Sequence, residues 1–256
     1  MKKNRRGSTC LRLGVFLFVL MFCPLSSCQT INSTAAGLEL PQMTIILSFD
    51  DGPNSLDDST ARLLELLDKY RIKAMFSLLG INAEYEPDIV RLIHEQGHLI
   101  INHGYYDKWA YPMGKNKFRD NLLKGEAAIN AALGTESRPL LYRPHGGYFR
   151  RSQEKIWRKE GYTIVSCNAR AYDAILKKSG KDRAVRKILN KVEKQGAGII
   201  LLHDAKDSHV RMEKKLKKQP NGSYNRSWIP DATEIIITAL LENGYTFTSP
   251  AVLYSN

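Results

Sequence analysis

Short apolar runs alternate with amphipathic segments along most of the chain, and this alternation constrains the fold more than any other feature. Seven runs have the length of β-strands: 43–49, 73–79, 98–101, 140–143, 162–167, 198–202 and 245–248. Six segments between them have helical periodicity: 57–70, 87–96, 116–133, 151–160, 182–194 and 231–242. This alternation predicts an α/β fold with a parallel sheet. Because no Gly-rich phosphate loop follows the first strand, we expect a closed or nearly closed barrel rather than a nucleotide-binding fold.

The leading 27 residues have the pattern of a secretory signal and are not expected to join the fold. Residues 1–12 carry five basic and no acidic side chains, and the apolar run 13–23 is too short to cross a bilayer. The sequence Leu25-Ser26-Ser27-Cys28 resembles the lipobox of bacterial lipoproteins, in which the cysteine is diacylated. We expect an exported lipoprotein of the bacterial cell envelope, held to a membrane through Cys28. Cleavage nearby that releases a soluble protein is the alternative.

Residues 28–41 predict a short tether, since they are rich in small and polar side chains, and 42–256 predict a single catalytic domain. If the signal is removed and Cys28 is lipidated, Cys167 is the only free thiol left, so no internal disulfide can form. The hydrophobic core must then stabilise the fold, and the chain is long enough to build one.

Basic residues exceed acidic ones, giving a net charge of +12. The segment 206–226 alone holds seven basic side chains. It is either a solvated loop or a rim that attracts an anionic polymer. Nucleic acid is not expected as a partner, because the chain carries an export signal and no matching aromatic and basic motif. The oligomeric state cannot be predicted from the sequence.

Polar motifs follow the predicted strands, where parallel α/β folds gather their catalytic groups. Asp50 and Asp51 end the first strand, and their repulsion needs a cation or a positive partner to offset it. His103 and Asp107 follow the third strand and would share a face if that segment were helical. Together with Asp51 they would suit a divalent ion. The alternatives are a helix-capping Asp-Gly-Pro turn and a structural histidine.

Two further motifs follow later strands. After the fourth comes Arg143-Pro144-His145-Gly146-Gly147, whose glycines permit close backbone approach and N–H groups that bind an oxyanion. His203 follows a very apolar strand in Leu201-Leu202-His203-Asp204. A Gly-rich surface turn and a structural histidine are the alternatives. Each motif alone is weak evidence for catalysis.

Taken together and in this order, the four motifs resemble those of the NodB-type polysaccharide deacetylases, carbohydrate esterase family 4. The resemblance extends over about residues 43–252. It implies a distorted (β/α)7 barrel, the NodB homology domain, with one divalent metal ion, commonly Zn²⁺. It also implies roles for individual residues. Asp51 and His103 would be metal ligands, Asp50 the general base oriented by Arg143, Gly146 an oxyanion donor through its N–H, and His203 the general acid.

The sequence departs from the family pattern at three places. Asp107 stands where the family has its second metal histidine, so we expect an Asp-His-Asp site that would also suit Co²⁺, Mn²⁺ or Fe²⁺. The family motif Asp-x-x-Asp-Trp becomes Arg170-Ala171-Tyr172-Asp173-Ala174, in which Asp173 is expected to pair with Arg143 or His203. The usual Pro-Tyr becomes His145-Gly146, so His145, Gly146 and Gly147 are expected to line a wider substrate groove.

The sequence thus predicts a metal-dependent hydrolase that removes N-acetyl groups from a polysaccharide containing N-acetylglucosamine and releases acetate. Peptidoglycan is the first choice, because an envelope lipoprotein lies beside it. Two alternatives remain: hydrolysis of another acetyl ester or amide, such as acetylxylan, and glycan binding without catalysis. The polymer and the acetyl position attacked cannot be read from the sequence.

Overall fold

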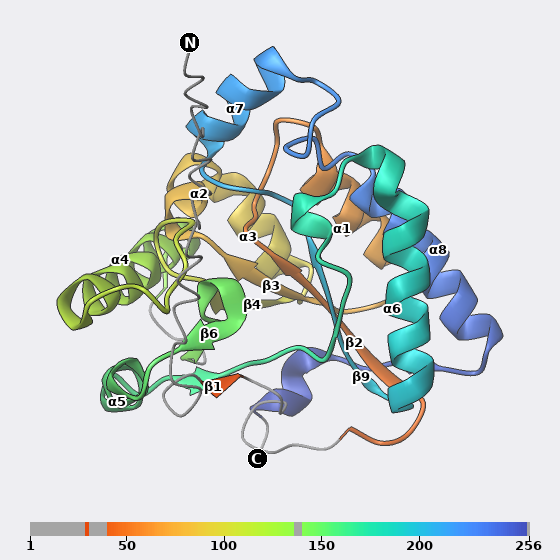
Figure 1. The fold of residues 1–256 in the computed structure, drawn as a ribbon, viewed down its shortest axis with the longest axis horizontal. Helices are drawn as coiled ribbons and strands as arrows, with labels where there is room; N and C mark the ends of the chain where they lie inside the picture. Colours follow the sequence, from red (N-terminus) through yellow and green to blue (C-terminus); the bar gives the residue numbers. More distant parts are fainter. Residues whose placement is uncertain (1–28, 31–39, 136–139, 255–256) are drawn as a thin grey trace, which may run out of the picture.

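A parallel sheet forms the centre of the computed structural model, which describes residues 29–30, 40–135 and 140–254 (Figure 1). Its strand order is β7-β5-β4-β3-β2-β9-β8, with β10 paired to β2, and every pairing is parallel. The bounds are β2 Thr44–Asp50, β3 Met75–Leu78, β4 Leu99–Asn102, β5 Leu141–Tyr142, β7 Thr163–Ile164, β8 Ala169–Arg170, β9 Gly198–His203 and β10 Thr246–Phe247. The edge strands β7 and β8 are joined by residues 165–168 alone, which curves the sheet into a distorted barrel. The predicted fold is confirmed.

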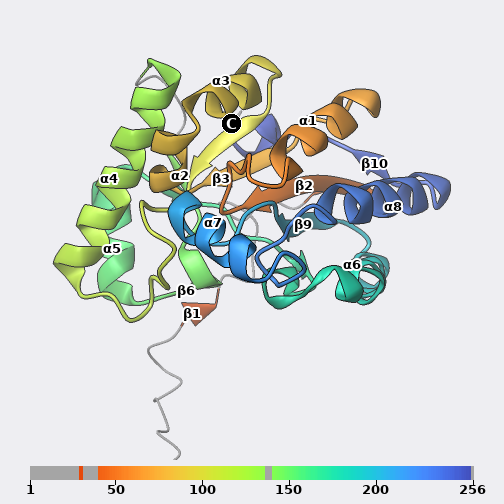
Figure 2. The same ribbon diagram turned by 90° about the horizontal axis from the view of Figure 1, so that it is seen from above.

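Helices lie around the outside of the curved sheet (Figures 1 and 2). The helices α1, α6 and α8 lie on one side, and α4 and α5 lie on the opposite side. The bounds are α1 Ser59–Lys69, α2 Gly80–Tyr85, α3 Pro87–Glu95, α4 Lys115–Leu133, α5 Arg151–Lys159, α6 Lys181–Gln195, α7 His209–Lys218 and α8 Ile229–Glu242. A separate two-stranded ribbon pairs β1 (Gln29–Thr30) antiparallel with β6 (Tyr148–Phe149). Short 3-10 turns are η3 His145–Gly147, η4 Asp173–Ile175, η5 Lys178–Gly180 and η6 Pro250–Leu253.

The central strand β2 explains why the apolar runs read as continuous. All of its residues are buried, because Ile45, Leu47 and Phe49 pack on the surrounding helices, whereas Ile46 packs on side chains of the neighbouring strands inside the barrel. The strand ends in the buried pair Asp50 and Asp51. Its neighbour β9 runs in the same direction and places His203 directly opposite Asp50. The motifs after these two strands therefore meet at one edge of the sheet.

Helix α4 approaches the segment after β4 closely, and this contact depends on Gly125. A Cβ atom at Gly125 would lie 2.6 Å from the carbonyl carbon of Gly104 and 2.7 Å from Oδ1 of Asn102. The absence of a side chain thus lets the helix rest against the backbone on either side of His103.

The six predicted helices and seven predicted strands are present with small shifts in their ends. The sequence did not predict α2, α7, β1, β6 or β8. Helix α7 lies inside the basic segment 206–226, and Met212 is its one buried residue, so its apolar periodicity is weak. Within the described ranges, no helix is long and apolar enough to cross a membrane. The predicted signal, 1–27, and Cys28 lie outside the described residues.

Candidate active site

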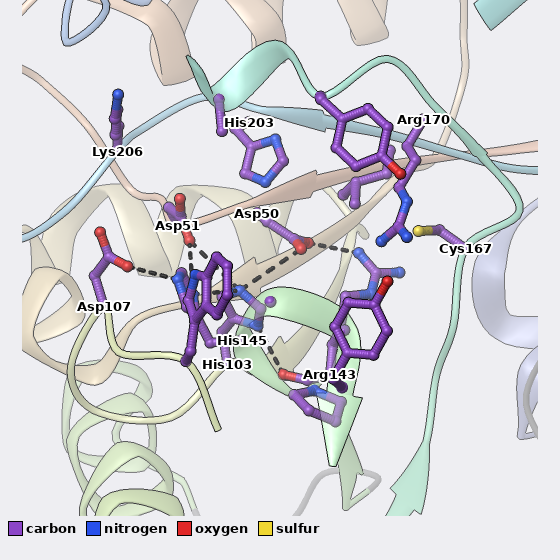
Figure 3. A pocket seen from close by; sticks show the side chains of 18 of the residues that line it. Asp50, Asp51, His103, Asp107, Arg143, His145, Cys167, Arg170, His203 and Lys206 are labelled. Carbon is purple, nitrogen blue, oxygen red and sulfur yellow. Dashed lines mark hydrogen bonds and ion pairs between the residues drawn. The ribbon is translucent and has the colours of Figure 1, made fainter. Parts of the chain in front are cut away.

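The polar motifs surround a single cavity of about 650 Å³ at the carboxyl ends of the strands (Figure 3). Its lining includes Asp50, Asp51, His103, Asp107, Arg143, His145, Gly146, Gly147 and His203. Apart from Asp173, which is fully buried behind His203, every residue of the predicted site within the described ranges lies on this wall. The sequence prediction that the strand ends would bring these motifs together is therefore correct as to place.

Asp50 forms a buried ion pair with Arg143. Nη1 of Arg143 lies 2.5 Å from Oδ1 of Asp50, and both side chains are less than 5% exposed. Arg143 also donates to Oγ of Ser48 and to the carbonyl oxygen of Val165, so its guanidinium is fixed in position. Burial favours the neutral acid, but Arg143, His103 and His203 outweigh burial and lower the pKa of Asp50. Asp50 is thus an ionised carboxylate at neutral pH, as a general base requires.

Three side chains converge beside this pair with the spacing of metal ligands. Oδ1 of Asp51 lies 3.4 Å from Nε2 of His103 and 3.6 Å from Nδ1 of His145, and the two nitrogens are 3.2 Å apart. One ligand atom from each of the three lies within 4.8 Å of the others. Oδ1 of Asp51 is buried and, within the described residues, has no hydrogen-bond partner. A buried carboxylate oxygen facing two imidazoles fits a divalent cation, which would satisfy it.

The far nitrogen of each imidazole has a hydrogen-bond acceptor. Nδ1 of His103 lies 2.7 Å from the carbonyl oxygen of Arg143, and Nε2 of His145 lies 2.6 Å from Oδ1 of Asp107. Acceptors there fix the proton on the far nitrogens, which leaves Nε2 of His103 and Nδ1 of His145 free to bind a metal. The residues present therefore fit a tetrahedral ion with an open position.

The structure gives Asp107 and His145 places that differ from the sequence prediction. Asp107 was expected as the third ligand, but it lies behind His145 and contacts the nitrogen facing away from Asp51. The helical spacing argument fails because residues 103–107 are irregular, with bends at 105–107, and form no helix. His145 was expected only on the groove wall. In the structure it is the third member of the group that could hold a metal ion, together with Asp51 and His103. The sequence signal that could have found it is a histidine three residues after the end of β5.

His203 is held by a second buried ion pair. Its Nδ1 lies 3.0 Å from Oδ1 of Asp173, and its backbone N–H donates to Oδ2 of the same carboxylate. Of the two predicted partners of Asp173, the structure selects His203. Arg226, which the sequence analysis missed, is fully buried with its Nη2 2.7 Å from Oδ2 of Asp173. Burial disfavours the imidazolium, but Asp173, Asp51 and Asp50 outweigh burial and raise the pKa of His203 to about 9. The imidazole is therefore protonated at neutral pH, as a general acid requires.

Replacing Asp173 with asparagine should lower the pKa of His203, because the charge that favours the imidazolium is lost. If the reaction needs protonated His203, its rate then begins to fall at a lower pH than in wild type. The alkaline limb of the pH profile should move down by about 1–3 pH units. The pH profile of kcat for acetate release measures this shift. Thermal unfolding measures whether the loss of the Asp173 charge beside the buried Arg226 destabilises the fold. An alkaline limb at the same pH in both proteins would contradict the role of Asp173.

The Gly146–Gly147 turn forms another part of the cavity wall. Both glycines have positive φ, 79° and 75°, which favours residues without a side chain. A Cβ atom at Gly146 would lie 3.2 Å from the ring of Trp109. The N–H of Gly147 donates to the carbonyl oxygen of Pro144 within the turn. Because the N–H of Gly147 is used within the turn, the N–H of Gly146 is the one that we expect to bind the oxyanion.

A buried polar network holds the Asp51 backbone, whose φ of 75° is rare outside glycine. Nδ2 of Asn82 donates to the carbonyl oxygen of Asp51. A Cβ atom at Gly52 would lie 2.5 Å from the Asp204 carboxylate, so the turn packs directly on it. Burial raises the pKa of Asp204 to about 7, even though Oγ1 of Thr60 donates to it. This network fixes the direction in which Asp51 points.

Comparison with known proteins agrees with this geometry. Two peptidoglycan-N-acetylglucosamine deacetylases of Bacillus cereus are similar in sequence. One is 28% identical over 211 residues, 82% of this chain and 87% of the relative. The other is 33% identical over 129 residues, 50% of this chain and 46% of the relative, so the chain spans less than half of that protein. The crystal structure of the Bc1960 peptidoglycan N-acetylglucosamine deacetylase has a TM-score of 0.69 and 25% identity, with 88% of this chain and 92% of that chain covered.

The family model described as polysaccharide deacetylase matches residues 38–165, which is half of the chain. The match includes the Asp50-Asp51 pair, His103 and the Arg143–Gly147 turn. The chain therefore belongs to the polysaccharide deacetylase family, carbohydrate esterase family 4, and has the fold of its deacetylases.

Proposed function

We propose that the chain is a metal-dependent hydrolase that removes N-acetyl groups from a glycan containing N-acetylglucosamine, with peptidoglycan as its first substrate. The observation that carries this proposal is that Asp50, ion-paired with Arg143 and so kept ionised, stands opposite His203, ion-paired with Asp173 and so kept protonated, in a single cavity. These are the two states that amide hydrolysis needs, since a base must activate water and an acid must protonate the departing amine.

The reaction divides among the residues of the cavity as follows. Asp50, held ionised by Arg143, takes a proton from the water that attacks the acetyl carbonyl carbon. The N–H of Gly146 donates to the oxygen on which negative charge develops. His203 gives its proton to the amide nitrogen as the carbon–nitrogen bond breaks. The products are acetate and a free amino sugar, and Asp173 and Arg226 keep His203 oriented throughout.

Asp51, His103 and His145 would hold the divalent ion, with Asp107 fixing the ring of His145. A bound Zn²⁺ would polarise the acetyl carbonyl and lower the pKa of water. Two imidazoles and one carboxylate favour Zn²⁺ and also suit Co²⁺, Mn²⁺ or Fe²⁺.

Peptidoglycan is favoured because both Bacillus cereus relatives are named for deacetylation of its N-acetylglucosamine. We would incubate the metal-loaded chain with peptidoglycan, chitooligosaccharides and acetylxylan, and measure new free amines and released acetate. Equal amounts of amine and acetate from peptidoglycan are expected. Acetate from acetylxylan without amine would indicate an esterase. Acetate from none of the three, with metal bound, would support the glycan-binding alternative.

We also propose that residues 1–27 direct export and that Cys28 carries the lipid anchor. When the full chain is expressed in a bacterial host, Cys28→Ala should move the protein from the membrane fraction to the soluble envelope or culture fraction and remove incorporation of labelled fatty acid. Cys23→Ala, a matched change in the same leading segment, should do neither. Unchanged membrane association of the Cys28 variant would exclude this anchor.

A further inference from the structure

Arg170 places a cationic group on the cavity, away from the metal-binding side chains. It ends β8 and pairs in register with Leu201 of β9, two residues before His203. Figure 3 shows it on the opposite side of Asp50 from His145 and Asp107. A Cβ atom at Gly147 would lie 3.2 Å from Nη1 of Arg170, so the guanidinium rests beside the Gly146–Gly147 turn.

Arg170 differs from the other two arginines of this region in having no acidic partner. Arg143 pairs with Asp50, and Arg226 pairs with Asp173. Within the residues that the structure describes, no carboxylate and no hydrogen-bond acceptor contacts the guanidinium of Arg170. Its guanidinium lies over the ring of Tyr172, whose centroid is 5.1 Å from Cζ. A half-buried guanidinium therefore presents unused donors to the cavity.

We infer that Arg170 binds a carboxylate on the substrate, carried by the N-acetylated sugar or by its direct neighbour in the glycan. The inference rests on the proposed deacetylase function and names its substrate class, an anionic glycan. A guanidinium forms two parallel hydrogen bonds to a carboxylate, and this interaction is stronger in a partly desolvated cavity than in water. The carboxylate would come from the lactyl ether of a muramic acid residue or from a uronic acid.

Position in the cavity supports this assignment. The carboxylates of Asp51 and Asp107 stand on the metal side of the cavity, whereas Asp50 is paired with Arg143. An anionic substituent is most favourable at the far end, where Arg170 lies over the Tyr172 ring and Tyr148 also lines the cavity. Both tyrosine rings are at least one-third exposed and offer faces for a sugar ring, whose carboxylate then lies within reach of the guanidinium.

The test compares three oligosaccharides of similar length on the metal-loaded chain. They are a neutral chitooligosaccharide, a glycan strand with muramic acid and no stem peptide, and an N-acetylhexosamine–uronic acid oligosaccharide. The readout is the ratio of kcat/KM for each anionic substrate to kcat/KM for the neutral one. Arg170→Gln should lower this ratio about 10- to 100-fold, and Arg170→Lys should lower it less, since the charge remains but the fork is lost.

Lys187→Gln is the matched control. Its Nζ also lies over the Tyr172 ring, at 4.6 Å, but it is exposed and does not line the cavity. The ratio should not change in this variant. The muramic acid and uronic acid substrates differ in where the carboxylate sits, so the one whose ratio falls identifies its source.

An unchanged ratio in Arg170→Gln for both anionic substrates would overturn the inference, as would an equal loss in Lys187→Gln. If wild type releases acetate from none of the three, the proposed deacetylase function is wrong, but this result does not test the role of Arg170. Calorimetric binding of the same oligosaccharides to Asp50→Asn, alone and with Arg170→Gln, then decides the inference. A binding preference for the carboxylate glycan that disappears with Arg170 supports it, and equal binding overturns it.

Discussion

Replacing Asp50 with asparagine is expected to reduce the rate of acetate release about a thousandfold, within the range that a positioned general base contributes. Asparagine has nearly the same shape but cannot accept the proton of the attacking water. The pKa of Asp50 is lowered because Arg143, His103 and His203 outweigh burial, so the wild-type carboxylate is ionised throughout the neutral range. The measurement is kcat for acetate release at saturating substrate, with the metal content of both proteins matched.

This substitution also leaves Arg143 buried without its counter-ion, which can destabilise the fold. Thermal unfolding and metal stoichiometry therefore accompany the kinetics. Asp58→Asn is the matched control, because Asp58 is an exposed residue of the same connection between β2 and α1, and asparagine suits its φ of 56°. Its kcat should stay within about twofold, since exposed substitutions away from a site rarely change more. A kcat for Asp50→Asn as high as wild type would mean that another group is the base.

Replacing His145 with alanine is expected to weaken metal binding more than any change at Asp107. In the structure His145 shares the group with Asp51 and His103, whereas Asp107 contacts only the far nitrogen of the His145 ring. Loss of such an outer partner costs about 10- to 100-fold in metal affinity, and loss of a ligand should exceed this range. Competition for Zn²⁺ against a chelating dye measures the affinity independently of catalysis.

The controls for this experiment separate the two ligand sets. Asp107→Asn should keep one metal per chain at micromolar Zn²⁺, with reduced affinity, and His94→Ala, an exposed histidine on α3, should change nothing. If Asp107→Asn loses more affinity than His145→Ala, the Asp-His-Asp set predicted from the sequence is correct and the grouping seen in the structure is not the metal site.

The sequence predicted the fold well because its signals are local and repeated. The central strand reads as one apolar run since it is buried on both faces, and the long amphipathic helices show their period directly. The elements that it missed are short or weakly patterned. Strand β8 spans two residues, and α7 buries only Met212 beneath a strongly basic face.

For the site, the sequence predicted which motifs meet but not which side chains touch. The strand ends bring Asp50 opposite His203, which a parallel sheet makes predictable. The contact of His145 with Asp107 joins two separate loops, and no spacing rule covers it. Arg226 belongs to a segment that reads as solvated, yet the chain folds back and buries it against Asp173, 53 residues away in sequence. Such pairings depend on tertiary structure and leave no local pattern.

The most direct test of the central claim is acetate release from peptidoglycan by the chain stripped of metal and then reloaded with Zn²⁺. We expect no release after stripping, recovery at one Zn²⁺ per chain, and one free amine for each acetate. Release that persists in the stripped protein, or none from the fully loaded protein on peptidoglycan, chitooligosaccharides or acetylxylan, would contradict a metal-dependent deacetylase.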